Sequence, residues 1–90
     1  LQEAMAVTPV APNPVRGQGT ARVTVRETQP VQAVLYDALG RRVRTIYDGE
    51  LQAQQPQALQ VEASTLASGT YFLRVQGETA QHTTRFVVVR

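Results

Sequence analysis

The sequence predicts an all-β fold, an immunoglobulin-like antiparallel β-sandwich of about seven short strands. Three observations support this class: apolar and polar side chains alternate in several short runs, turn-forming residues separate these runs about every eight to twelve residues, and no window of about a dozen residues has the spacing of an amphipathic helix. The 90 residues form one small domain that contains no Cys. Packing and hydrogen bonds must therefore stabilise it without disulfides.

Residues 1–11 are predicted to be a linker or an N-terminal edge segment, and residues 12–90 to form the sandwich. Pro9, Pro12 and Pro14 each favour extended backbone in the preceding residue and remove a hydrogen-bond donor. Such a segment suits a linker or the edge of a sheet, where proline prevents pairing with another chain.

The next two strands are expected at residues 21–26 and 31–36. Residues 21–26 alternate between apolar and polar side chains, as a half-buried strand does. The second half of residues 31–36 is apolar on both faces, which favours a central strand. A turn is expected at residues 37–40, where Gly40 supplies a positive φ.

Residues 41–47 are predicted to be extended, with two irregular features nearby. The alternation slips between Val43 and Ile46, which predicts a β-bulge. Asp48 and Gly49 form the strongest two-residue hairpin signal in the chain and predict a turn.

Three further segments complete the predicted sandwich. Residues 59–63 alternate as a strand does, and residues 64–68 are expected to form a loop or a single helical turn around Leu66. Gly69 opens the next strand, in which Tyr71 lies on the inward face. The closing strand, at residues 81–89, is apolar on both faces near its end, so we expect it to be central in its sheet or covered by a partner.

The charge of the chain is mildly basic. The net charge is +2, the isoelectric point is about 9.7, and all basic residues except His are Arg. These arginines are scattered among acidic residues, which favours a solvated surface over a nucleic-acid-binding arm. Arg22 shares a strand face with Arg26, and Arg42 with Arg44; on neighbouring strands they would form a shallow cationic surface for an anionic partner.

Residues suited to catalysis are few, so the sequence predicts no enzyme. His82 is the only His and lies in a polar run, as surface residues do. Ser64 and Ser68 lack the glycine pattern of a nucleophile elbow. No apolar run reaches the roughly 18 residues that a membrane-spanning helix needs.

Metal, cofactor and sugar sites are not expected either. Asp37, Asp48 and Glu50 lie near predicted turns, and turn preference explains them better than calcium binding does. The chain lacks Trp, the largest ring for a sugar platform. We therefore interpret its aromatic residues as core residues, namely Tyr36, Tyr47, Tyr71, Phe72 and Phe86.

Several segments, taken in order, resemble the type A C-terminal sorting domain of the type IX secretion system of the Bacteroidetes group. They are PNP (residues 12–14), LYDALGRRV (residues 35–43), LASGTYFLRV (residues 66–75) and the closing strand RFVVVR (residues 85–90). The resemblance covers about residues 9–90. The positions that carry the family pattern are Pro12, Asn13, Pro14, Asp37, Gly40, Arg41, Gly69, Tyr71, Arg85, Val88, Val89 and Arg90.

The resemblance implies a function in protein secretion. Such a domain ends a larger secreted protein, often a hydrolase, and is read by an outer-membrane translocon. A sortase-like protease commonly removes it and can join the cargo to an anionic lipopolysaccharide. This implies a secreted or cell-surface location reached through the periplasm and outer membrane, no chemistry in the domain itself, and cleavage in or before residues 1–11. Family members often carry Lys near the closing strand, where this sequence has Arg85 and Arg90.

The residues leave other possibilities open. The domain would be a monomer or a weak dimer through its apolar terminal strand. An immunoglobulin-like structural spacer and a hook-capping-like sandwich share the strand and turn pattern, and a carbohydrate-binding module is a less favoured alternative. A spacer would usually be followed by more chain, whereas a sorting signal ends its protein, and this sequence stops at Arg90.

Overall fold

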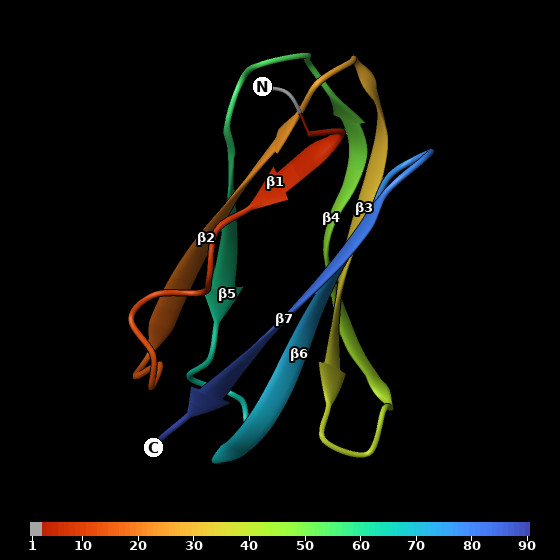
Figure 1. Cartoon of the computed structure of the whole chain (residues 1–90). Helices are drawn as coiled ribbons and strands as arrows, with labels where there is room; N and C mark the ends of the chain where they lie inside the picture. Colours follow the sequence, from red (N-terminus) through yellow and green to blue (C-terminus); the bar gives the residue numbers. More distant parts are fainter. Residues whose placement is uncertain (1–2) are drawn as a thin grey trace.

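The computed structural model describes residues 3–90 as two β-sheets packed face to face (Figure 1). The strands are β1 (Met5–Val7), β2 (Gln18–Val25), β3 (Gln29–Asp37), β4 (Arg42–Leu51), β5 (Gln57–Glu62), β6 (Gly69–Gln76) and β7 (Gln81–Val88). One sheet has the order β1-β2-β5 and the other the order β4-β3-β6-β7. The predicted all-β sandwich is therefore confirmed. Within residues 3–90, no helix is long and apolar enough to span a membrane.

The core lies between the two sheets and follows from the alternation of side chains along the strands. On β6, Tyr71, Leu73 and Val75 are buried, as the alternation predicts, while the residues between them are only half-buried. Phe86 on β7 and Leu59 on β5 are fully buried in the same cluster. Burial of apolar surface from both sheets stabilises the sandwich, at about 25 cal/mol per Å² of area removed from water.

Strand β4 confirms one predicted irregularity and contradicts the other. Its pairing with β3 skips Val43 and Ile46, so the slip in alternation marks real shifts of register. The turn predicted at Asp48 and Gly49 is wrong, because β4 continues through both residues to Leu51. The unbroken pairing of residues 47–51 with β3 outweighs the turn preference of the Asp-Gly pair, and the chain reverses after Leu51 instead.

Strand β7 lies at the edge of the four-stranded sheet rather than in its centre. One edge of β7 is paired with β6 along the whole strand. On its other side, Val15 forms an isolated parallel bridge with Val88. The last part of this edge strand is therefore covered by a segment of its own chain.

The residues before Pro12 include an edge strand of the three-stranded sheet. Strand β1 pairs with β2, with Met5 opposite Val25. Val10 is buried between the sheets, and Ala11 forms a bridge with Thr20 on β2. Hydrogen bonds and packing thus extend through residues 5–11.

The single cationic surface considered for the four arginines does not form. Arg22 lies on β2, whereas Arg42 and Arg44 lie on β4 in the other sheet. Arg42 pairs with Tyr36 and Arg44 with Leu35, which places the two β4 arginines on opposite faces. The skipped Val43 causes this change of face, so the expectation of a shared face is wrong.

Candidate functional site

The family-like segments meet at one end of the sandwich, which we call the motif end. It consists of residues 12–15, the turn at residues 37–41, the loop at residues 66–69 and residues 86–90. Asp37 pairs with Tyr71, and Gly69 pairs with Val88, so the turn, the loop and the end of β7 are adjacent. Figure 1 shows this end at the bottom, with the C-terminus beside it.

Asp37 organises the turn between β3 and β4. Its Oδ1 accepts hydrogen bonds from the backbone N–H groups of Leu39 and Arg41, each at 2.9 Å, and its Oδ2 accepts one from Arg41 Nε at 2.8 Å. Gly40 completes the turn with a φ of +81°, which glycine adopts without a steric cost. The backbone N–H of Arg41 is the main group that lowers the pKa of the Asp37 carboxyl, because it favours the charged form.

The loop at residues 66–69 is held by groups from the strands on both sides of it. The Tyr71 hydroxyl donates a hydrogen bond to the Ala67 carbonyl at 2.7 Å, and the Tyr71 ring stacks on Phe86 with centroids 6.0 Å apart. Arg90 reaches the same loop: its backbone N–H donates to Ser68 Oγ at 3.0 Å, and Nη1 donates to the Leu66 carbonyl at 3.2 Å. The last residue of the chain is therefore tied to the loop.

The PNP segment (residues 12–14), together with Val15, covers the last part of the open edge of β7. Asn13 Oδ1 accepts a hydrogen bond from the Val87 N–H at 3.0 Å. The Val15 N–H donates to the Val87 carbonyl at 2.7 Å, and the Val89 N–H donates to the Val15 carbonyl at 3.0 Å. The segment thus satisfies edge groups that would otherwise be open to another strand.

The predicted family positions divide into core residues and solvent-exposed residues. Tyr71 and Val88 are buried, and Val89 is half-buried. Asp37 is also half-buried. The remaining eight predicted positions are exposed: Pro12, Asn13, Pro14, Gly40, Arg41, Gly69, Arg85 and Arg90. Arg85 lies away from the motif end, on the outer face of the four-stranded sheet, opposite Phe72.

Leu39 is a candidate contact residue that the sequence reasoning missed. Its side chain is 77% exposed at the tip of the 37–41 turn. The neighbours Asp37, Gly40 and Arg41 each have a role in shaping this turn, whereas Leu39 contributes no side chain to the core. A large apolar residue inside an Asp-x-x-Gly turn was the signal available in the sequence, because such turns are normally polar.

The aromatic residues fill two places. Tyr71 and Phe86 belong to the core, as predicted, and Tyr47 packs against it. Tyr36 and Phe72 pair with each other on the outer face of the four-stranded sheet, where both are half-buried, so the interpretation of these two as core residues is wrong.

The side chains considered for catalysis or metal binding are dispersed. His82 lies near the start of β7, whereas Ser68 contacts Arg90 just beyond the end of that strand. At about 3.3 Å per residue, the two are separated by roughly 25 Å. Among residues 3–90, no group of three His, Asp or Glu side chains is arranged to hold a metal ion.

Comparison with known proteins identifies the class of this domain. The family model of the secretion system C-terminal sorting domain matches residues 9–89. The chain therefore belongs to this family, the C-terminal sorting domains of the type IX secretion system, whose members direct proteins through the outer membrane to the cell surface or the exterior. The family is one of sorting signals, and the spacer and hook-capping alternatives are not favoured.

A solved structure supports the same fold. The chain is similar to part of dimeric latent PorU from Porphyromonas gingivalis, with a TM-score of 0.72 and 19% identity over 97% of this chain. The match covers 10% of the PorU chain, so this domain corresponds to about a tenth of that protein. No curated protein sequence matches the chain significantly.

Proposed function

We propose that the motif end is the surface that the outer-membrane translocon recognises in this sorting domain. The observation that carries the proposal is the meeting of the family segments at one end, with the Leu39 side chain in solvent at its tip. Burial of such an apolar side chain against a partner removes its surface from water, which favours association. The hydrogen bonds of Asp37 fix the turn in advance, which reduces the entropy lost on binding.

We assign residues 12–90 to the sorting domain and residues 1–11 to the linker or N-terminal edge segment through which the cargo is attached. The cargo is a larger secreted protein on the N-terminal side. Met5 approaches Gly77, in the connection between β6 and β7, at the end of the sandwich opposite the motif end. Attachment there leaves the motif end accessible while the cargo is still joined.

A sortase-like protease then removes the domain by cutting before Met5, and can join the cargo to an anionic lipopolysaccharide. Strand β1 is paired with β2, the Thr8 N–H donates to the Arg22 carbonyl at 2.9 Å, and Ala11 is bridged to Thr20. Proteases cut most readily in exposed segments without such backbone bonds. These contacts support a cut on the N-terminal side of the described edge strand.

In this scheme the domain is a recognition element and performs no catalysis. The dispersal of His82, Ser68 and the acidic side chains supports this role. The domain acts as a monomer, because the PNP segment already covers the end of β7 through which a dimer would form.

The test is secretion of a fluorescent protein fused ahead of residues 1–90, in a host with a type IX apparatus. A fusion that ends at Arg85 lacks Phe86 and Val88 and so loses core as well as motif residues. The sharper variant is Leu39→Ser, which leaves the core intact. We expect the unchanged fusion to reach the medium or cell surface without the domain, and Leu39→Ser to remain in the periplasm, folded. Equal secretion of the unchanged fusion and the Leu39→Ser fusion would contradict recognition at the motif end.

A further inference from the structure

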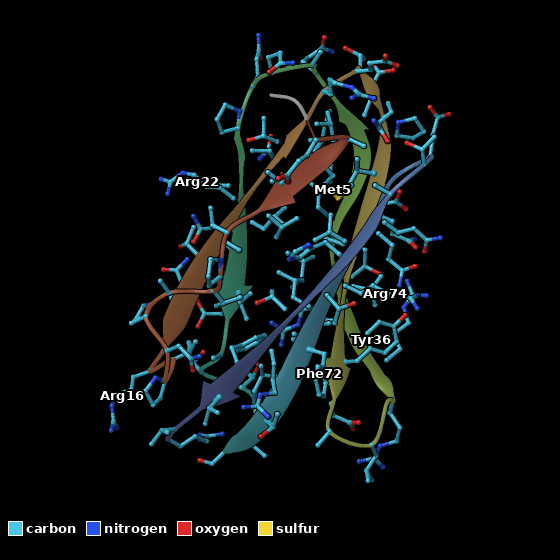
Figure 2. The ribbon with its side chains drawn as sticks, in the orientation of Figure 1. Met5, Arg16, Arg22, Tyr36, Phe72 and Arg74 are labelled. Carbon is cyan, nitrogen blue, oxygen red and sulfur yellow. The ribbon has the colours of Figure 1, made fainter. Side chains whose placement is uncertain are left out.

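The outer face of the four-stranded sheet carries a row of arginine and aromatic residues that crosses all of its strands. Arg42 on β4 pairs with Tyr36 on β3, Tyr36 pairs with Phe72 on β6, and Phe72 pairs with Arg85 on β7. In Figure 2, Tyr36, Phe72 and Arg74 lie together beside this sheet. We call the surface made by Val34, Tyr36, Arg42, Phe72, Arg74 and Arg85 the aromatic–arginine face.

Arg74 is fixed in place on this face. Its guanidinium lies 4.8 Å from the centre of the Tyr36 ring and donates a hydrogen bond to the Tyr36 hydroxyl. Arg74 pairs across the sheet with Val34, which is 1% exposed although it lies outside the core cluster between the sheets. The face therefore has a small apolar centre of its own, with a cation held over an aromatic ring.

The charge on this face is positive, and the carboxylate of Asp48, which pairs with Gln32, lies one row beyond the face. The neighbouring row consists of Thr45, Val34, Arg74 and Thr83, so neither row contains a carboxylate. In the described chain, the Arg85 side chain has no hydrogen-bond or ion-pair partner, whereas Arg41, Arg44 and Arg90 use their guanidinium groups within the fold.

We propose that the aromatic–arginine face binds an acidic protein surface of the translocon, a second contact that rests on the function proposed above. Tyr36 and Phe72 would pack on an apolar centre of the partner, and the arginines would bind carboxylates around it. Aromatic residues and Arg are enriched in protein interfaces, and a guanidinium can bind a carboxylate through two parallel hydrogen bonds. The positive charge and the apolar centre thus together specify the chemistry of the partner.

The test compares two double charge reversals in the fluorescent fusion. Arg42→Glu with Arg85→Glu changes the aromatic–arginine face, and Arg16→Glu with Arg22→Glu makes the same change of net charge on exposed residues elsewhere (Figure 2). We expect at least a tenfold loss of secretion for the first pair and nearly unchanged secretion for the second. Urea unfolding of each isolated 90-residue domain verifies that both pairs remain folded.

The outcomes separate this proposal from the one on which it rests. If the unchanged fusion is not secreted, the proposed function itself fails. If that fusion is secreted and the Arg42/Arg85 variant is secreted equally well, binding through the aromatic–arginine face is wrong. The same holds if both double variants lose secretion equally. In either case the sorting function stands.

A contact experiment then identifies what lies against the face. A photo-crosslinking residue at Phe72 should link the fusion to an outer-membrane protein of the secretion apparatus, and the link should disappear with Arg42→Glu and Arg85→Glu. The matched control places the same residue at Thr24, which lies on β2 in the other sheet and is half-buried like Phe72. Crosslinking at both positions, or charge-dependent sedimentation of the domain with phosphatidylglycerol vesicles in place of a protein link, would overturn the proposal.

Discussion

The Asn13 side chain and the Val87 backbone are joined by a hydrogen bond of 3.0 Å between residues 74 positions apart in the chain. This bond links the PNP segment to the last strand, and the Val15 backbone bonds to Val87 and Val89 extend it. The segment therefore covers the last part of the edge of β7 and keeps that part from pairing with another chain.

Replacement of Asn13 by Ala should weaken this cover. The Val87 N–H would lose its acceptor, at a cost of about 1 kcal/mol in the free energy of unfolding, because water can replace only part of the bond. Denaturant unfolding measures the loss, and amide hydrogen exchange should show faster exchange at Val87. Asn13→Asp keeps an acceptor oxygen and serves as the control; if it exchanges as fast as Asn13→Ala, the side-chain bond is not what protects Val87.

Gly40 should tolerate Asn better than Ala. Its φ of +81° lies in the left-handed region, and an added Cβ would meet no atom within 4 Å. The cost of Gly40→Ala is therefore conformational, about 1–2 kcal/mol, with no clash to relieve. Asn enters this region more readily than Ala, so Gly40→Asn should lose less stability in a urea titration. Equal losses for the two variants would show that the backbone conformation of the turn is not the source of the cost.

Acid should weaken the turn at residues 37–41 through protonation of Asp37. The folded domain lowers the pKa of this carboxyl below its ordinary value of 3.8. The stabilisation is therefore complete at pH values above 3.8 and is lost as the pH falls through the lower, folded-state pKa. Unfolding measured between neutral pH and the acid range should show this loss. The Asp37→Asn variant should lack this part of the pH dependence; an unchanged acid profile in that variant would assign the loss to other carboxyls.

Most of the fold could be predicted from the sequence because alternation along a strand directly reports which face is buried. The inward face of β6 and the irregular pairing of β4 near Val43 and Ile46 were both visible in this way. Asp48 and Gly49 misled the prediction because a turn preference is local, whereas pairing with β3 depends on residues far away in the chain.

The arrangement of the site was less predictable for a similar reason. The family resemblance located the PNP segment, but nothing local shows that its Asn13 bonds to Val87. The need for glycine at position 19 likewise becomes evident only in the folded structure, because a Cβ there would lie 2.8 Å from Val10 and 3.0 Å from Val15. The row from Arg42 to Arg85 exists only once the order of the strands is known.

The Tyr71 hydroxyl should stabilise the 66–69 loop independently of the Tyr71 ring. Tyr71→Phe removes the 2.7 Å bond to the Ala67 carbonyl and keeps the stacking on Phe86. Because Ala67 is exposed and water can reach its carbonyl, the cost should be about 0.5–1 kcal/mol in the free energy of unfolding.

Removal of the whole ring gives the matched comparison. Tyr71→Ala leaves a cavity beside Phe86 and should cost about 3–5 kcal/mol. In Tyr71→Phe, amide exchange should accelerate in the loop while the core amide of Leu73 keeps its protection, because only the loop has lost a contact. If both regions exchange faster to the same extent, the hydroxyl stabilises the domain as a whole and the loop has no separate anchor.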